Sequence, residues 1–256
     1  MKAVILAGGL GTRLREETEF KPKPMVEIGG MPILWHIMKN LSVQGINEFV
    51  ICLGYKGEVI KDFFLNYYSR TNNLTVRISD NTIVGKIGTQ NKENWEVTLV
   101  NTGLMTQTGG RIKRIEEFVR NEDFLCTYGD GLADLKLSEL LKFHNSHTGI
   151  ATVTSVNPPS RFGALEIDAS KKVTDFVEKP GETHWINGGF FVFKKEVFNY
   201  LDDECVLEGE PLRRLSHSGA LFAYQHHGFW QPMDTYRETT ELNKLYENNE
   251  APWKNW

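Results

Sequence analysis

A short apolar run that stops at a cluster of glycines constrains the fold of this chain more than any other feature. Residues 3–6 read Ala-Val-Ile-Leu, and Gly8, Gly9 and Gly11 follow at once. A continuous apolar run of this length is typical of a strand buried on both faces. Glycines at its end let main-chain N–H groups approach a ligand closely. The pattern predicts an open α/β fold with a binding site at the carboxyl ends of the strands.

Strand-like runs and helix-like patterns alternate along the first 156 residues. Besides residues 3–6, strands are expected at residues 49–53, 74–78, 97–100, 124–128 and 150–156. Helices are expected at residues 57–66 and 136–144, and in a stretch that Pro32 opens and Gly45 stops. Strands separated by helices imply right-handed crossovers. The expected fold class is α/β, with a Rossmann-like, mostly parallel mixed sheet flanked by helices.

The later part of the chain is patterned differently. Residues 164–167 and 173–177 flank a short polar turn, which predicts a small hairpin-like β insertion. A helix near residues 196–201, a strand at 221–225 and a terminal helix at 236–246 are expected after it. Residues 81–96 are polar and weakly patterned, so we expect a loop there. Because neither a low-complexity linker nor an internal repeat divides the chain, we expect one domain over residues 1–256.

Composition excludes several classes of protein. Hydrophobic residues make up 40% and charged residues 24% of the chain, as in ordinary globular proteins. The formal net charge of −4 describes neither a nucleic-acid surface nor a membrane-docking patch, so neither partner is expected. No apolar run approaches the roughly 20 residues that a membrane span needs. The cysteines are odd in number, far apart and outside any C-x-x-C pair, which indicates buried, reduced thiols and a cytoplasmic location: Cys52, Cys126 and Cys205.

Spacing separates several interpretations of the glycine-rich segment. A Walker A loop requires Gly-Lys followed by Ser or Thr, and no such triplet closes this one. A dinucleotide-binding fingerprint requires a third glycine at position 14, where the chain has Leu14. A tight strand-to-helix turn without a ligand remains open on the glycines alone. If the segment binds phosphate, the cations that balance it must be concentrated in one cleft, because the whole chain is slightly acidic.

Two aspartates stand next to expected strands or helices. Asp130 follows the strand at residues 124–128 and lies between Gly129 and Gly131, so its carboxylate can project beyond the sheet. An Asp-Gly turn is the alternative. Asp234 precedes the terminal helix, where an N-cap is the alternative. Position alone leaves these structural roles open for both residues.

The glycine-rich segment also carries a resemblance to a known family. Gly8-Gly9-Leu10-Gly11-Thr12-Arg13-Leu14, followed by Lys21-Pro22-Lys23-Pro24, resembles the signature of the sugar-phosphate nucleotidyltransferases. The resemblance implies a GT-A-like fold and an enzyme in which Arg13 and Lys23 reach the phosphates, with Lys21 a solvated neighbour. Such cations are needed because the two phosphate groups that react repel each other. The loop that would wrap the nucleotide consists of Leu6, Ala7, Gly8, Gly9, Leu10, Gly11, Thr12 and Arg13.

The same resemblance assigns roles to other residues. It implies a Mg2+ ion held by Asp130 and Asp234, and it makes Asp130 catalytic together with the two cations. The residues that match nucleotide contacts of the family are Thr106, Arg111 and Gly129. The segment Val177-Glu178-Lys179-Pro180 resembles the sugar-phosphate site, in which the lysine holds the phosphate and the glutamate contacts hydroxyls. Asn187 would hydrogen-bond sugar hydroxyls and Gly188 would let the sugar approach the main chain, although a plain turn is the alternative.

Similarity to the members of this family that use CTP extends over the whole chain. It includes residues 1–4, 24–28, 230–234 and 251–254. It implies in-line attack of α-D-glucose 1-phosphate on CTP, giving CDP-glucose and diphosphate for the 3,6-dideoxyhexoses of bacterial lipopolysaccharide O-antigen. It also implies a homo-oligomer, either a trimer or a hexamer. A uridylyl or thymidylyl transferase and a non-catalytic nucleotide-sugar-binding module remain alternatives. Trp253 and Trp256 fit either a subunit interface or packing on their own chain.

Overall fold

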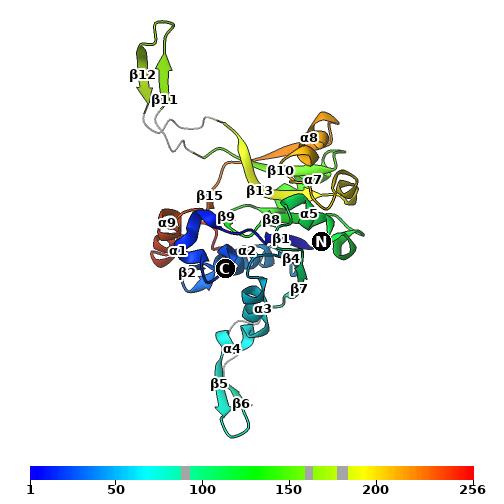
Figure 1. Cartoon of the computed structure of the whole chain (residues 1–256), viewed down its shortest axis with the longest axis vertical. Helices are drawn as coiled ribbons and strands as arrows, with labels where there is room; N and C mark the ends of the chain where they lie inside the picture. The colour runs from blue at the N-terminus through cyan, green and yellow to red at the C-terminus, as the bar shows by residue number, and fades with distance from the viewer. Residues whose placement is uncertain (88–92, 159–163, 178–183) are drawn as a thin grey trace.

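A seven-stranded mixed sheet forms the centre of the computed structural model, which describes residues 1–87, 93–158, 164–177 and 184–256 (Figure 1). The strand order is β14-β10-β13-β8-β1-β4-β7. All neighbours are parallel except β13, which runs antiparallel to both β10 and β8. The strands are β1 (Ala3–Ala7), β4 (Glu48–Leu53), β7 (Glu96–Asn101), β8 (Phe124–Tyr128), β10 (Ala151–Val156), β13 (Ile186–Phe193) and β14 (Leu221–His226). The predicted α/β class with a mostly parallel mixed sheet is confirmed.

Helices cover both faces of this sheet. The α-helices are α1 (Arg15–Thr18), α2 (Ile33–Ser42), α3 (Gly57–Leu65), α4 (Tyr67–Thr71), α5 (Thr108–Lys113), α6 (Glu116–Val119), α7 (Leu137–Asn145), α8 (Glu210–His217) and α9 (Tyr236–Glu247). Short 3-10 helices are η1 (Thr12–Leu14), η2 (Lys23–Met25) and η3 (Lys195–Tyr200). Apolar side chains of β1 alternate between the two faces, so that Ile5 packs with α2 and α9 while Val4 packs with α5 and α8. Both faces of β1 are therefore buried, as its unbroken apolar run predicts.

Helix α2 lies where the local sequence predicts a helix. Its N-cap is Pro32, and its predicted apolar stripe, which includes Leu34 and Met38, is buried. The helix ends at Ser42, and the chain turns at Gly45 with a φ of 101°, a conformation that favours glycine. Among the described residues, no helix combines the length and the apolarity that a membrane crossing requires.

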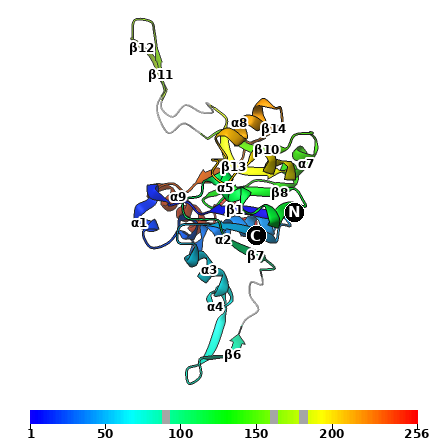
Figure 2. The ribbon, with the colours of Figure 1, turned by 45° about the vertical axis from the view of Figure 1, so that its right-hand side comes forward.

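Two hairpins project from opposite ends of the molecule, as Figures 1 and 2 both show. The predicted insertion forms one of them, with β11 (Ala164–Ile167) antiparallel to β12 (Val173–Val177). The second pairs β5 (Asn73–Arg77) with β6 (Thr82–Ile87). The loop predicted at residues 81–96 is therefore wrong for Thr82–Ile87, because pairing with β5 supplies the order that the local composition does not. Residues 88–92 lie outside the described part of the chain.

Two further short pairs hold loops next to the sheet. They are β2 (Glu27–Ile28) with β3 (Met31–Pro32), and β9 (Gly131–Ala133) with β15 (Trp230–Pro232). The second pair brings the segment after β8 alongside the segment before α9, through Gly131 opposite Pro232. It also carries a main-chain hydrogen bond of 2.8 Å from Met233 N to Asp130 O. Two loops that are about a hundred positions apart in the sequence are thereby fixed side by side.

The C-terminal tryptophans pack on their own chain. Trp253 is completely buried, with its ring 5.5 Å from that of Phe229, and Trp256 packs edge-on against Trp35 at 5.7 Å. This settles the choice that the sequence left open. The cysteine prediction is confirmed for the buried Cys52 and Cys126 but is wrong for the third: Cys205 is only partly buried, because it lies in a surface loop before α8.

Candidate functional site

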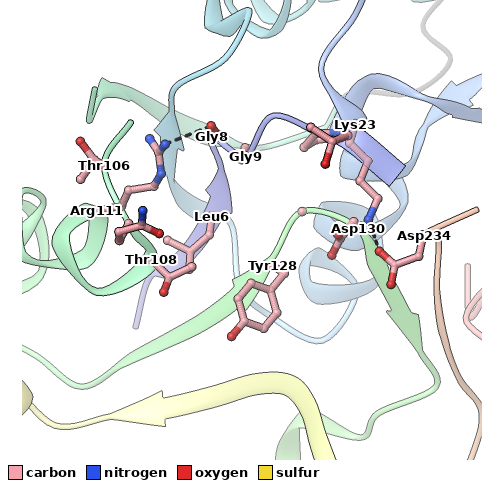
Figure 3. Close-up of a pocket in the computed structure, with 16 residues that line it drawn as sticks. Leu6, Gly8, Gly9, Lys23, Thr106, Thr108, Arg111, Tyr128, Asp130 and Asp234 are labelled. Atoms are coloured by element: carbon pink, nitrogen blue, oxygen red, sulfur yellow. Dashed lines mark hydrogen bonds and ion pairs between the residues drawn. The ribbon is translucent and has the colours of Figure 1, made fainter. Parts of the chain in front are cut away.

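A cavity of about 290 Å3 opens at the carboxyl ends of β1 and β8 (Figure 3). These neighbouring parallel strands are in register, with Leu6 opposite Tyr128, so the glycine-rich segment and Asp130 leave the sheet side by side. A hydrogen bond of 3.0 Å from Gly129 N to Leu6 O continues this pairing beyond the strand ends. The lining residues are Leu6, Ala7, Gly8, Gly9, Gly11, Thr12, Lys23, Pro24, Thr106, Gln107, Thr108, Arg111, Tyr128, Gly129, Asp130 and Asp234.

At one end of the cavity a lysine bridges two aspartates. Lys23 Nζ lies 2.5 Å from Asp130 Oδ2 and 2.6 Å from Asp234 Oδ1 (Figure 3). Burial works to lower the pKa of Lys23, but the charges and hydrogen bonds of the two aspartates outweigh it and hold this pKa above its ordinary value. The lysine is therefore a stable cation, and carboxylates from two separate loops converge on it. We call Lys23, Asp130 and Asp234 the acidic end.

The capping of α9 explains why Asp234 can point into the cavity. The N-cap of this helix is Thr235, whose hydroxyl accepts a hydrogen bond from Glu238 N. The Glu238 carboxylate in turn accepts hydrogen bonds from the main-chain N–H groups of residues 234 and 235. This capping box begins the helix after Thr235, so the N-cap position is held by Thr235 and not by Asp234. The alternative role of Asp234 as an N-cap is therefore not the one found.

The acidic end fits a divalent cation. Two carboxylate oxygens already lie at hydrogen-bonding distance from one ammonium nitrogen, which occupies the place that a shared cation would take. Within the described ranges, no group of three or more His, Cys, Asp or Glu side chains is arranged to hold a metal. Two carboxylates plus ligand oxygens are the set typical of magnesium at nucleotide sites. The donor set thus matches magnesium better than it matches zinc, which prefers nitrogen and sulfur ligands.

At the other end Arg111 joins three segments of main chain. Its Nη1 donates to Leu53 O at 3.0 Å, Thr102 Oγ1 at 2.8 Å and Gly103 O at 2.7 Å, and its Nη2 donates to Gly8 O at 3.0 Å and Leu104 O at 3.2 Å. The side chain is 4% exposed, and burial lowers the pKa of the guanidinium from its ordinary value. Within the described chain, none of these five acceptors is a carboxylate. Arg111 thus fixes the glycine-rich segment to the ends of β4 and β7; we call this region the arginine end.

Glycine is required at two positions of the arginine end by close approach. A Cβ atom on Gly8 would lie 2.2 Å from the Arg111 guanidinium carbon. A Cβ atom on Gly54 would lie 2.5 Å from Gly8 O and 2.7 Å from Arg111 Nη1. In contrast, a Cβ atom on Gly9 would meet nothing within 4 Å. Part of the glycine signature therefore makes room for an arginine, and part leaves main chain open to the cavity.

Comparison with known families decides the class of this site. The nucleotidyl transferase family model matches residues 2–229. The chain belongs to the nucleotidyl transferase family. Both ends of the cavity lie within the matched part except for Asp234.

Relatives and solved structures agree with this assignment. The nucleotidyl transferase chain is 52% identical over 259 aligned residues to the glucose-1-phosphate cytidylyltransferase of Salmonella typhi, with 100% of both chains covered. It is 45% identical to the probable glucose-1-phosphate cytidylyltransferase of Bacillus subtilis, again with 100% of both covered. It is also similar to the crystal structure of HddC from Yersinia pseudotuberculosis, with a TM-score of 0.70, 25% identity, and 96% and 99% of the two chains covered. The predicted GT-A-like nucleotidyltransferase fold is confirmed.

Most of the residues expected at the nucleotide of this nucleotidyl transferase line the cavity. Among the loop residues these are Leu6, Ala7, Gly8, Gly9, Gly11 and Thr12, and elsewhere in the chain they are Lys23, Thr106, Arg111, Gly129 and Asp130. Leu10 is not among the lining residues and is 43% exposed. The side chain of Arg13 lies outside the part that the structure describes. Lys21 lies next to the loop and pairs with Glu17 at 3.5 Å on the surface.

The expected sugar-phosphate residues are placed less fully. Glu178 and Lys179 lie outside the described residues. Asn187 is the second residue of β13 and accepts a hydrogen bond of 2.8 Å from Gly189 N. A Cβ atom on Gly188 would lie 2.8 Å from Val156 Cγ1, so the absence of a side chain there is needed for packing against β10. Their predicted contacts with a sugar remain predictions.

Sequence reasoning missed several polar residues of the cavity. Tyr128 ends β8, and Gln107 and Thr108 begin α5. Tyr128 was interpreted only as the last residue of a strand, although a polar side chain that ends a buried parallel strand is a signal for a ligand site. Glu208 hydrogen-bonds Tyr128 and Thr108 from a loop eighty positions away from Tyr128, and no local pattern marks it.

Proposed function

We propose that this nucleotidyl transferase is a glucose-1-phosphate cytidylyltransferase, which converts CTP and α-D-glucose 1-phosphate to CDP-glucose and diphosphate. The observation that carries the proposal is the convergence of Asp130 and Asp234 on one cation beside the glycine-rich segment. Full-length identity of 52% to the Salmonella typhi cytidylyltransferase supports the choice of substrates.

The chemistry requires one bond to form and one to break. An oxygen of the sugar phosphate forms a bond to the α-phosphorus of the nucleotide, and the bond from that phosphorus to the bridging oxygen of diphosphate breaks. The chain must bring two anions together and stabilise negative charge on the departing diphosphate. Lys23 is suited to this because its pKa is held above its ordinary value, so it stays charged at neutral pH. We assign Lys23 and Arg13 as the phosphate cations and Asp130 as a catalytic residue.

Asp130 and Asp234 would hold Mg2+ in this proposal. When bound, the ion would neutralise phosphate oxygens and so favour departure of diphosphate. The two aspartates are kept at a shared position by the pairing of β9 with β15 and by the bond from Met233 N to Asp130 O. Lys23 balances their charges in the structure described here, and it would turn toward phosphate when another cation takes its place between them.

The rest of the nucleotide is assigned to the glycine-rich segment and the arginine end. Main-chain groups of Leu6 to Arg13, with Thr106, Arg111 and Gly129, would contact it, and Leu10 would do so through its main chain. Because Arg111 is already bonded to five oxygens of the chain, its principal contribution is to hold the Gly8 carbonyl and the start of α5 in place.

The hexose phosphate is assigned to residues from the β11–β12 insertion and β13. Lys179 would bind its phosphate, while Glu178, Asn187 and Gly188 would contact the sugar. Kinetics of Lys179→Ala test this assignment, with a KM for glucose 1-phosphate that rises at least about tenfold because a charge-assisted bond is lost. Unchanged turnover together with unchanged affinity for the hexose phosphate would reject it.

One assay decides between this function and its alternatives. Diphosphate release is measured with glucose 1-phosphate, Mg2+ and each of CTP, UTP, dTTP and GTP in turn. The proposal expects the highest kcat/KM with CTP. A preference for UTP or dTTP would make the chain a uridylyl or thymidylyl transferase, and binding of nucleotide without any turnover would make it a nucleotide-sugar-binding module.

The setting of the reaction is also part of the proposal. We place it in the cytoplasm, where CTP is available, as a step toward the 3,6-dideoxyhexoses of lipopolysaccharide O-antigen. We further propose that residues 1–256 form one domain and assemble into a trimer or hexamer. Exposed apolar side chains on both projecting hairpins support assembly, since monomeric proteins rarely expose such groups together: Val76 and Ile78 on one side, and Leu165, Ile167, Val173 and Phe176 on the other. Light scattering of the purified protein measures the number of subunits.

A further inference from the structure

The loop at residues 202–209 is packed tightly against one wall of the cavity. Cys205 O accepts a hydrogen bond of 3.0 Å from Gly110 N, and Thr108 Oγ1 accepts one of 2.9 Å from Leu207 N. A Cβ atom on Gly110 would lie 2.2 Å from Asp203 O. Nothing larger than glycine fits there, so the start of α5 and this loop form one packed unit.

Glu208 extends from that loop to two residues that line the cavity. Its Oε2 accepts a hydrogen bond of 2.6 Å from Thr108 Oγ1, and its Oε1 accepts one from the hydroxyl of Tyr128. The Tyr128 ring is held in turn against the main chain at Gly189, where a Cβ atom would lie 2.6 Å from Tyr128 Cδ2. One carboxylate thus links the start of α5 to the end of β8.

The direction of these hydrogen bonds follows from the groups present. An ionised carboxylate has no hydrogen to donate, so it accepts from both hydroxyls. Burial raises the pKa of Tyr128 and the charge of Glu208 raises it further, so the phenol keeps its proton. Thr108 Oγ1 accepts from Leu207 N and donates its one hydrogen to Glu208. Both hydroxyl hydrogens therefore point at Glu208, and only oxygen lone pairs remain for a bound molecule.

We propose that Glu208 is a positioning residue that makes this wall of the cavity an acceptor surface, formed by the oxygens of Thr108 and Tyr128, for a hydrogen-bond donor of the substrate. The proposal deepens the proposed function and rests on it. The donor is a hydroxyl or an amino group, because phosphate oxygens at neutral pH carry almost no donor hydrogens. It belongs to the base, the ribose or the hexose.

The charge of Glu208 also favours one orientation of a substrate bound in the cavity. A carboxylate beside one wall repels the phosphates, while the cation Lys23 lies at the acidic end of the cavity. A substrate that placed its phosphates against Thr108 and Tyr128 would face acceptors and a negative charge together. Glu208 therefore works against the reversed orientation as well as for the productive one.

The test is the discrimination of Glu208→Gln between substrates that differ by one donor. Rates are measured with CTP against UTP, 2′-deoxy-CTP and 3′-deoxy-CTP, and with glucose 1-phosphate against its 2-, 3-, 4- and 6-deoxy analogues. A glutamine can accept from only one of the two hydroxyls through its single oxygen, so one hydroxyl hydrogen turns toward the cavity. For one of these analogues, we expect the ratio of kcat/KM between the natural substrate and the analogue to fall about tenfold in Glu208→Gln, mostly through a change in KM. The ratios for the other analogues should stay unchanged. The analogue whose ratio falls identifies the donor.

Matched variants separate this role from a loss of folding. Glu210→Gln removes the same charge two residues away, where Glu210 pairs only with Arg213 on the surface of α8 as far as the described contacts go, and it should keep every ratio. Tyr128→Phe and Thr108→Val each remove one acceptor, and one of them should reproduce the lost discrimination. Ratios for Glu208→Gln that all stay within about twofold of wild type, at an unchanged melting temperature, would overturn the inference.

Calorimetric titration with the same nucleotides and sugar phosphates keeps the two proposals apart. If the wild-type protein shows no turnover with any triphosphate, the proposed function fails. Dissociation constants then still report whether Glu208→Gln changes the preference for a donor. If turnover is present but no preference depends on Glu208, only the inference about Glu208 fails.

Discussion

The two ends of the cavity each hold a cation, partly buried at one end and buried at the other, but its charge is balanced in different ways. At the acidic end Lys23 lies between two carboxylates that come from separate loops. At the arginine end Arg111 donates to carbonyl and hydroxyl oxygens of three chain segments. A cation between two carboxylates can be exchanged for another cation without dismantling the chain, whereas a guanidinium bonded to main chain is part of the framework. The first arrangement therefore suits the proposed chemistry, whereas the second holds the shape of the cavity.

The largest effect that this comparison predicts is on turnover at the acidic end. Asp130→Asn keeps the size of the side chain but removes its charge, and we expect kcat for diphosphate release to fall about a thousandfold, as for loss of a preorganised group that stabilises the transition state. Stability should change little, because Asp234 still pairs with Lys23. The measurement is kcat at saturating substrates over a range of Mg2+ concentration, with urea unfolding alongside.

Asp62→Asn, at an exposed position on α3, is the control for the charge change and should keep full turnover. Turnover of Asp130→Asn within about tenfold of wild type would show that the acidic end does not carry the reaction.

Substitution of Arg111 at the arginine end should lower the stability of the folded protein. In Arg111→Met five oxygens lose their donor, and we expect the free energy of unfolding in urea to fall by about 3 kcal/mol, since buried acceptors without partners are costly. Arg111→Lys should recover little of this loss, because a single ammonium cannot span the five acceptors. Arg120→Met, at an exposed arginine after α6, is the matched control. Equal stabilities of all three variants would remove the structural role assigned to Arg111.

Substitutions at two adjacent glycines test the same structural role of Arg111, with a smaller expected loss of stability. Gly8→Ala places a methyl group on the Arg111 guanidinium, and we expect it to lower the free energy of unfolding by about 2 kcal/mol, as overpacking does in other proteins. Gly9→Ala meets nothing within 4 Å and should leave stability within about 0.5 kcal/mol of wild type. The difference between the two urea midpoints is the measurement, and its absence would mean that the Arg111 side chain can move aside without cost.

The smallest expected effect is that of alkaline pH. The pKa of Lys23 is raised in the folded protein, so the stabilisation from its pairing is fully present below the ordinary value of 10.5 and is lost only as pH rises through the higher folded value. The difference in unfolding free energy between wild type and Lys23→Met should therefore be the same at pH 7 and pH 9.5. A wild-type stability that rises relative to that of Lys23→Met between these two pH values would indicate that burial, rather than the two aspartates, dominates the pKa of Lys23.

Sequence patterns predicted the sheet more fully than they predicted the cavity. Apolar runs such as residues 3–6 and the helix after Pro32 were confirmed because each depends on periodicity within a few residues. β13 was not expected, since Asn187, Gly188 and Gly189 at its start resemble a turn, and its antiparallel direction depends on pairing with β8 and β10.

The cavity residues follow the same rule: those marked by a local motif were predicted, and those placed by long-range contacts were not. Lys23 and Asp130 stand next to proline and glycine in recognisable motifs, and the structure brings them together. Glu208 is part of the cavity wall only because a loop folds back onto α5, and Asp234 could be distinguished from a helix cap only once Thr235 was seen to hold that place. A contact between residues that are far apart in the chain cannot be predicted from the local sequence around either residue.

The position of β7 at the edge of the sheet has a consequence for how such an enzyme could diversify. β7 pairs with β4 on one side only, and the segment that contains Thr106, Gln107 and Thr108 follows this strand in the sequence. Asp130, by contrast, follows a strand in the middle of the sheet. Thr106 and Gln107 precede the packed start of α5, so a substitution at either position can alter the wall of the cavity without reordering a strand, while the position of Asp130 stays fixed by the neighbours of β8.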